Sequence, residues 1–212
     1  MTVLGDPGMW SDTFPDHLIP RILDLVTETW ESFEKPTPTE HEVPITRRLK
    51  RALKQAKDYQ RLPVRIERES AEDDPITGEE LGRIDLKFLP AVSALEEVYF
   101  AFECKRLNIL ENGKRRTLAP EYVMEGVMRF VTGRYASIMQ HGGMIGYVLD
   151  GRCNDTIRLV QSNIRRRCRA LQLDADSILL QSRLPPDNPM IRETAHKLSR
   201  SFVLHHVFLS CR

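Results

Sequence analysis

Apolar and polar residues alternate along residues 83–88, and again from Phe102 to Lys105 at the end of a neighbouring apolar stretch, residues 98–105. A two-residue period is typical of β-strands, in which successive side chains point to opposite faces of the sheet. Glu103 and Lys105 therefore share one face of the second strand, and the apolar residues on either side of Glu103 share the other. Asp85 lies between apolar residues of the first strand. The pattern predicts a β-hairpin in which an aspartate faces a glutamate and a lysine.

Four other stretches place apolar residues at helical spacing, which predicts amphipathic helices. They cover residues 16–34, about 39–57, about 120–140 and 155–171. The second helix is expected to begin with a capping box, with Thr39 at the cap and Glu42 three residues on. The third contains Gly126 and Gly133. Glycine destabilises a helix interior, so we expect close packing of this helix against the sheet.

Four further stretches are predicted as strands: residues 62–67, 144–149, 177–182 and 202–209. The second of these is almost continuously apolar, as in a strand buried on both faces. The acidic residues 70–80 are expected to form a loop. Residues 1–15, rich in Gly, Pro and Asp, are expected to form a flexible arm, and residues 16–212 a single domain. We therefore predict an α/β fold with a mixed central β-sheet flanked by helices.

Composition sets the broad class. The chain has 212 residues, of which 41% are hydrophobic and 29% charged, and its net charge is only +1. That charge gives no overall signature of a polyanion-binding protein, although basic residues cluster locally. The four cysteines lack CxxC spacing, which argues against zinc and favours reduced thiols. No signal peptide or apolar span is visible, so we expect a cytoplasmic protein without a membrane partner.

The hairpin carries the candidate chemistry. Two carboxylates a few ångströms apart, here Asp85 and Glu103, form an oxygen-rich site suited to Mg²⁺ or Mn²⁺. Lys105, on the same face as Glu103, is placed to orient a water molecule and to offset charge on a phosphate. A second interpretation stands beside this one. The three side chains also fit the solvated face of an antiparallel sheet, with Glu103 and Lys105 neutralising each other.

An aspartate followed about eighteen residues later by Glu-x-Lys resembles the core of the PD-(D/E)xK nuclease superfamily. The proline that names the motif is absent, since Ile84 precedes Asp85. The order of hairpin, helix and strand extends the resemblance over residues 39–150. It implies a restriction-endonuclease-like core and a Mg²⁺-dependent nuclease that hydrolyses phosphodiester bonds in DNA. It further implies that Asp85, Glu103 and Lys105 are catalytic and that Asp85 and Glu103 bind the metal.

Members of this superfamily often carry a glutamate near the start of the helix before the hairpin, where it joins the metal site. Glu42 resembles that residue, and Glu40 is the alternate. A capping role without metal is equally compatible with the sequence. Six basic residues are candidates for contacts with nucleic acid, against the alternative of ordinary surface pairs: Arg47, Arg106, Lys114, Arg115, Arg129 and Arg134.

The densest basic cluster comprises Arg165, Arg166, Arg167 and Arg169. It is compatible with binding of nucleic acid, with an acidic partner, or with a solvated helix face. Compact one-domain proteins of the superfamily act in restriction or anti-phage defence, some beside a separate ATPase or sensor subunit. The resemblance therefore implies DNA as partner, with a homodimer or such a subunit as a second. The alternative function is a non-cleaving nucleic-acid-binding or partner subunit with the same fold.

Overall fold

The computed structural model describes residues 14–73, 77, 78, 80–91, 97–173 and 178–212, so most of the predicted N-terminal arm lies outside the described residues. The helices are α1 (Leu18–Glu31), α2 (Glu42–Tyr59), α3 (Ala119–Glu121), the π-helix η2 (Tyr122–Val127), α4 (Met128–Val131) and α5 (Cys153–Arg166). The strands are β1 (Val64–Glu67), β2 (Ser70–Asp73), β3 (Glu80–Ile84), β4 (Leu86–Pro90), β5 (Phe100–Leu107), β6 (Ile109–Glu111), β7 (Lys114–Arg116), β8 (His141–Val148), β9 (Leu180–Gln181), β10 (Ile191–Lys197) and β11 (Ser201–Ser210).

A mixed sheet of seven strands, counted over the described residues, runs through the centre in the order β1-β4-β5-β8-β11-β10-β9. β5, β8 and β11 are parallel neighbours, and the outer pairs on both sides are antiparallel. The predicted hairpin is the β4–β5 pair. Residues 92–96 of its connection lie outside the described residues. The predicted fold class, an α/β protein with a mixed central sheet flanked by helices, is confirmed.

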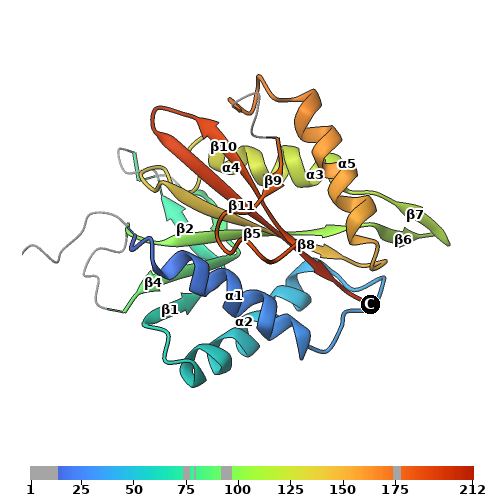
Figure 1. Cartoon of the computed structure of the whole chain (residues 1–212), viewed down its shortest axis with the longest axis horizontal. Coiled ribbons are helices and arrows are strands. Elements are labelled where there is room, and N and C mark those ends of the chain that lie inside the picture. The colour runs from blue at the N-terminus through green and yellow to red at the C-terminus, as the bar shows by residue number, and fades with distance from the viewer. Residues whose placement is uncertain (1–13, 74–76, 79, 92–96, 174–177) are drawn as a thin grey trace, which may run out of the picture.

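Helices cover both faces of this sheet (Figure 1). Tyr147 of β8 contacts the ring of Trp30 in α1 and the hydroxyl of Thr46 in α2. Its neighbour Gly146 lies against Tyr122 of η2. Because successive residues of a strand point to opposite faces, α1 and α2 form one layer and η2 belongs to the other. η2 also contacts α5, which packs on β11. The central strands are therefore buried from both sides.

The second helix begins three residues later than predicted, at Glu42, and the capping box does not form. His41 occupies the N-cap position and makes no side-chain capping bond. Pro44 explains the shift, because proline has no N–H to donate and is tolerated only in the first turn of a helix. A helix starting near Thr39 would place Pro44 beyond that turn. Glu42 is thereby left free to reach the sheet.

The predicted helix 120–140 ends much earlier. α3, η2 and α4 form a short continuous helical segment that stops at Val131. Gly133 follows with φ +73°, the left-handed conformation that terminates many helices. The prediction was therefore wrong for residues 132–140. Gly126 does pack closely, as expected, since a Cβ there would overlap the side chain of Met144.

Several strands were not predicted. The expected loop 70–80 contains β2, which pairs with β3 in a separate two-stranded ribbon. β6 and β7 form a second ribbon around the turn at Asn112 and Gly113, and β10 was missed entirely. β2, β6 and β7 are largely solvent-exposed, so they carry no apolar alternation to detect. The last helix spans Cys153–Arg166 rather than 155–171.

Gly143 of β8 provides a test of how tightly β8 packs against β5. A Cβ at Gly143 would overlap the buried ring of Phe102, its partner on β5. We expect Gly143→Ala to lower the free energy of unfolding by about 2 kcal/mol, because the ring has no space to move into. Gly126→Ala is the matched control. There the overlap is with the flexible end of Met144, so the loss should stay below about 1 kcal/mol. Equal losses in urea unfolding would contradict this reading of the core.

Candidate active site at the open edge of β5

β5 loses its antiparallel neighbour halfway along its length. β4 pairs with it only between Phe100 and Phe102, whereas β5 continues to Leu107. Along a strand, alternate residues direct both N–H and C=O toward the same edge. Cys104 and Arg106 therefore direct their backbone N–H and C=O groups toward the edge of β5 that β4 leaves unpaired. This open edge of β5 is where the candidate residues gather.

Two carboxylates take the place of the missing strand. Asp85 Oδ2 accepts a hydrogen bond from the backbone N–H of Cys104 at 2.7 Å. Glu42 Oε2 accepts one from the backbone N–H of Arg106 at 3.0 Å. Asp85 can do so because it lies at the break between β3 and β4, where the chain leaves the β2–β3 ribbon for the central sheet. The predicted strand 83–88 is thus divided at Asp85.

Glu103 lies on β5 between these two edge positions and is 0% exposed. Its Oε1 accepts hydrogen bonds from Lys105 Nζ at 2.7 Å and from Arg129 at 2.8 Å. Its Oε2 is buried and has no hydrogen-bond partner among the described residues. An unpartnered buried carboxylate oxygen is costly, so this atom is a natural position for a further ligand. The burial of Glu103 contradicts a solvated sheet face, whereas the ion pair of Glu103 with Lys105 that the same interpretation predicted is present.

Lys105 links the two glutamates of the site, Glu42 and Glu103. Its ammonium contacts Glu103 at 2.7 Å and Glu42 Oε1 at 3.2 Å. Glu42, rather than the alternate Glu40, is therefore the glutamate that reaches the site. Glu40 instead forms a bidentate pair with Arg48 at 2.9 and 3.0 Å.

Tyr135 was not identified from the sequence. Its hydroxyl accepts a hydrogen bond from Arg129 at 2.8 Å and donates one to the Arg83 carbonyl at 2.5 Å. Arg129 is thereby held between Tyr135 and Glu103. Nothing in the local pattern distinguishes Tyr135 from the other buried aromatic residues, because its role depends on where α4 ends.

Burial dominates the electrostatics of the two central carboxylates. It raises the pKa of Asp85 to about 6, against the opposing effects of the Cys104 N–H and of Lys105. Burial, followed by repulsion from Asp85, raises the pKa of Glu103 to about 7. Burial alone would lower the pKa of Lys105, but Glu103 and Glu42 outweigh it and raise that pKa above its ordinary value. Perturbed pKa values of this kind cluster at functional sites.

The donor set fits a hard divalent cation, although no three His, Cys, Asp or Glu side chains of the described residues form a ready metal cluster. Mg²⁺ commonly takes only one or two carboxylates and completes its coordination with water and substrate phosphate. Asp85 and the unpartnered Oε2 of Glu103 supply two such oxygens. The Cys104 carbonyl lies on the same edge as the Cys104 N–H that binds Asp85. Glu42, predicted as a third ligand, contacts Lys105 at 3.2 Å, and its role as a ligand stays a prediction.

The other predicted residues divide into two groups. Arg106 and Arg129 belong to the site, where Arg106 also donates to the Glu40 carbonyl at 3.2 Å. The other four predicted basic residues form no ion pair with Glu42, Asp85 or Glu103 within the described residues. Arg115 pairs with Asp150 at 3.0 Å. The others are exposed and, within the described residues, form no ion pair: Arg47, Lys114 and Arg134.

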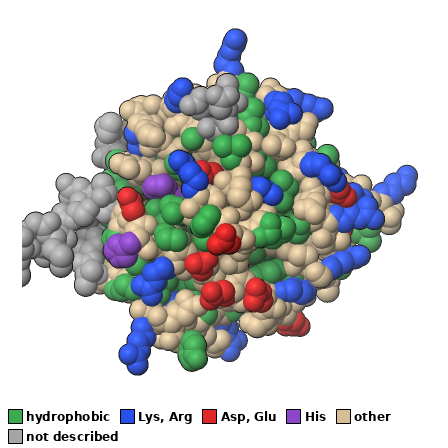
Figure 2. Space-filling model, in the orientation of Figure 1, with side chains coloured by type: hydrophobic (Ala, Val, Ile, Leu, Met, Phe, Trp, Pro, Cys, Tyr) green, Lys and Arg blue, Asp and Glu red, His purple; other side chains and the backbone are tan. Residues whose placement is uncertain are grey.

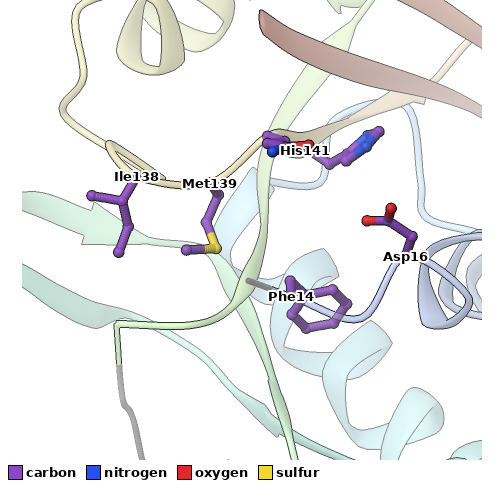
Figure 3. A pocket seen from close by; sticks show the side chains of 6 residues that line it. Phe14, Asp16, Ile138, Met139 and His141 are labelled. Atoms are coloured by element: carbon purple, nitrogen blue, oxygen red, sulfur yellow. The ribbon is translucent and has the colours of Figure 1, made fainter. Parts of the chain in front are cut away.

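A small cavity of about 150 Å³ lies away from this site, at the start of β8. It is lined by Phe14, Asp16 and His141, among others (Figure 3). The His141 ring is 3.2 Å from Nε2 of the buried His205. His206, next in β11, contacts Tyr122 in the other layer. The two adjacent histidines thus lie on opposite faces of the sheet, as the strand pattern predicts.

Neither a family model, nor a curated protein, nor a solved structure matches this chain. The superfamily resemblance therefore stays a prediction from the sequence. No helix in the part of the chain that the structure describes has the length and apolar character needed to cross a membrane.

Proposed function

We propose that this protein is a Mg²⁺-dependent deoxyribonuclease that hydrolyses phosphodiester bonds at the open edge of β5. The observation that carries the proposal is the arrangement of the half-buried Asp85 and Lys105 around the buried Glu103. It combines two carboxylates of raised pKa, an unpartnered oxygen on Glu103 and a lysine held between acidic groups. Glu103 thus forms ion pairs through Oε1 and keeps Oε2 available for a further ligand. By resemblance to the superfamily, the proposal extends to a role in restriction or anti-phage defence.

Each residue has a separate task in this proposal. Asp85 and Glu103 hold the cation, which when bound supplies Lewis-acid stabilisation of charge on the phosphate. Lys105 orients the attacking water and offsets charge on the phosphate oxygens. Glu42 is a positioning residue, because its 3.2 Å contact directs the Lys105 ammonium. Arg129 holds Glu103 in place through Oε1 and leaves Oε2 available.

The test is cleavage of supercoiled plasmid and linear duplex DNA by the purified protein in millimolar Mg²⁺ or Mn²⁺. We expect cutting by the parent, none in EDTA, and at least a 100-fold loss in Glu103→Gln, roughly as for removal of a transition-state contact. Glu34→Gln, which changes an exposed side chain, is the control and should cut normally. Calorimetric titration with Mn²⁺ gives an independent readout, since Glu103→Gln should also lose metal binding. Cutting by Glu103→Gln at the parent's rate would overturn the proposal.

A second candidate is a non-cleaving subunit that binds nucleic acid or another protein. It is favoured by the ion pairs of Glu103 with Lys105 and Arg129, which already balance much of the charge at the site. Mg²⁺-dependent DNA binding without cleavage by the folded parent would select this candidate.

A further inference from the structure

A basic surface lies beside the site, on the β6–β7 ribbon and α5. Residues 109–117 and 150–171 together contain nine Lys and Arg residues against three Asp and Glu residues, a net charge of +6. The whole chain carries only +1, so the rest of the molecule is acidic by comparison. Figure 2 shows Lys and Arg side chains gathered along the edge where Figure 1 places α5 and the β6–β7 ribbon.

The two parts of this basic surface are fixed to each other. Asn108, which joins β5 to β6, donates hydrogen bonds to Asp150 at 3.0 Å and to Thr156 of α5 at 2.5 Å. Arg115 of β7 contacts the same aspartate at 3.0 Å. The ribbon is therefore tied to the start of α5 by buried and half-buried contacts. These contacts fix the position of the ribbon's charges relative to the first turn of α5.

The basic surface also adjoins the candidate site directly. The open edge of β5 ends at Leu107, and the ribbon begins at Ile109. α5 follows β8, which runs parallel to β5, so both segments leave the sheet at the same end. The ribbon therefore continues from the end of β5, and α5 begins at the same end of the sheet.

The residue types of the basic surface favour duplex over single-stranded nucleic acid as its ligand. Proteins that bind single-stranded nucleic acid usually stack its bases on aromatic side chains. Residues 109–117 and 150–171 contain no Phe, Trp or Tyr. Exposed arginines without aromatic residues suit the phosphate backbone of a duplex, which is held mainly by charge. We infer that the basic surface binds the backbone of duplex DNA flanking the site, an inference that rests on the proposed function for the choice of DNA.

The experiment measures binding of a fluorescent duplex of about 20 base pairs, a length that spans two helical turns. Ca²⁺ replaces Mg²⁺ so that cleavage does not interfere. The test variant, Arg152→Gln with Arg165→Gln and Arg169→Gln, removes three exposed charges, one in α5 and one beyond each of its ends. The control removes three exposed charges elsewhere, namely Arg21→Gln on α1, Arg51→Gln on α2 and Arg65→Gln on β1. Both variants change the formal net charge from +1 to −2.

We expect the test variant to bind the duplex at least about tenfold more weakly than the parent and its salt dependence to fall by about two to three ion equivalents. The control should bind within about threefold of the parent, because its charges lie off the path of the backbone. Equal weakening in both variants, no weakening in the test variant, or no duplex binding by the parent would overturn the inference. Tighter binding of the matching single strand would overturn the duplex assignment. Because binding is measured without cleavage, a failed cleavage assay would count against the proposed function alone.

Discussion

Asp85→Asn should abolish Mg²⁺-dependent cleavage and, at pH 8, raise the free energy of unfolding by about 2 kcal/mol. The side-chain oxygen that accepts the Cys104 N–H is retained, so the local geometry should survive. The charge is removed from a buried position that raises the pKa of Asp85 to about 6. A gain in stability with a loss of activity is the expected signature of a carboxylate kept for function.

The sign of the pH dependence follows from this pKa. Between the ordinary value of 3.8 and about 6, the folded parent binds more protons at Asp85 than the unfolded chain does. The favourable contribution of Asp85 to the free energy of unfolding is therefore complete below about pH 4 and is lost as the pH rises through 6. The advantage of Asp85→Asn should be small at pH 4 and fully developed by pH 8. Urea unfolding at both values checks this, and a variant less stable than the parent at pH 8 would contradict it.

Lys105→Met should also abolish cleavage, but with the opposite effect on stability. Among the described residues, removing the ammonium leaves Glu103, which is 0% exposed, with Arg129 as its one cationic partner. Leaving a buried charge without its partner is strongly destabilising, so we expect a loss of about 3 kcal/mol at pH 8. The loss should shrink toward pH 5, because Glu103, whose pKa is raised to about 7, is then mostly protonated.

Lys54→Met, at an exposed position of α2, serves as the control and should change stability by less than about 0.5 kcal/mol. Cleavage rates and urea unfolding of the two lysine variants, at pH 5 and pH 8, complete the experiment. A fully active Lys105→Met would remove Lys105 from the proposed chemistry. A stable but inactive one would show that Glu103 finds another partner.

The centre of the site could be predicted because strand alternation fixes which side chains share a face. Glu103 and Lys105 are two residues apart on β5, so their proximity follows from the period of the strand alone. Asp85 was expected to face them from a paired strand, whereas it lies just before β4 and reaches β5 through the Cys104 N–H. The choice between Glu40 and Glu42 needed the structure, because it depends on Pro44 and on the first residue of α2.

The surroundings of the site were beyond sequence patterns. Arg129 was expected to contact phosphate from the surface, yet it points inward to Glu103 and Tyr135. An arginine suits both a surface position and an ion pair inside the site. Which of the two Arg129 adopts depends on where α4 ends, near Val131. The β2–β3 ribbon was missed for a related reason. Its exposed strands carry no apolar periodicity, so their pairing is visible only in three dimensions.

The open edge of β5 has a consequence for self-association. An exposed strand edge offers unpaired N–H and C=O groups to any neighbouring chain and can seed aggregation. Here the N–H groups of Cys104 and Arg106 are already bonded to Asp85 and Glu42. Two acidic side chains therefore occupy N–H groups to which another strand would bind. The same carboxylates thus hinder polymerisation through the open edge of β5.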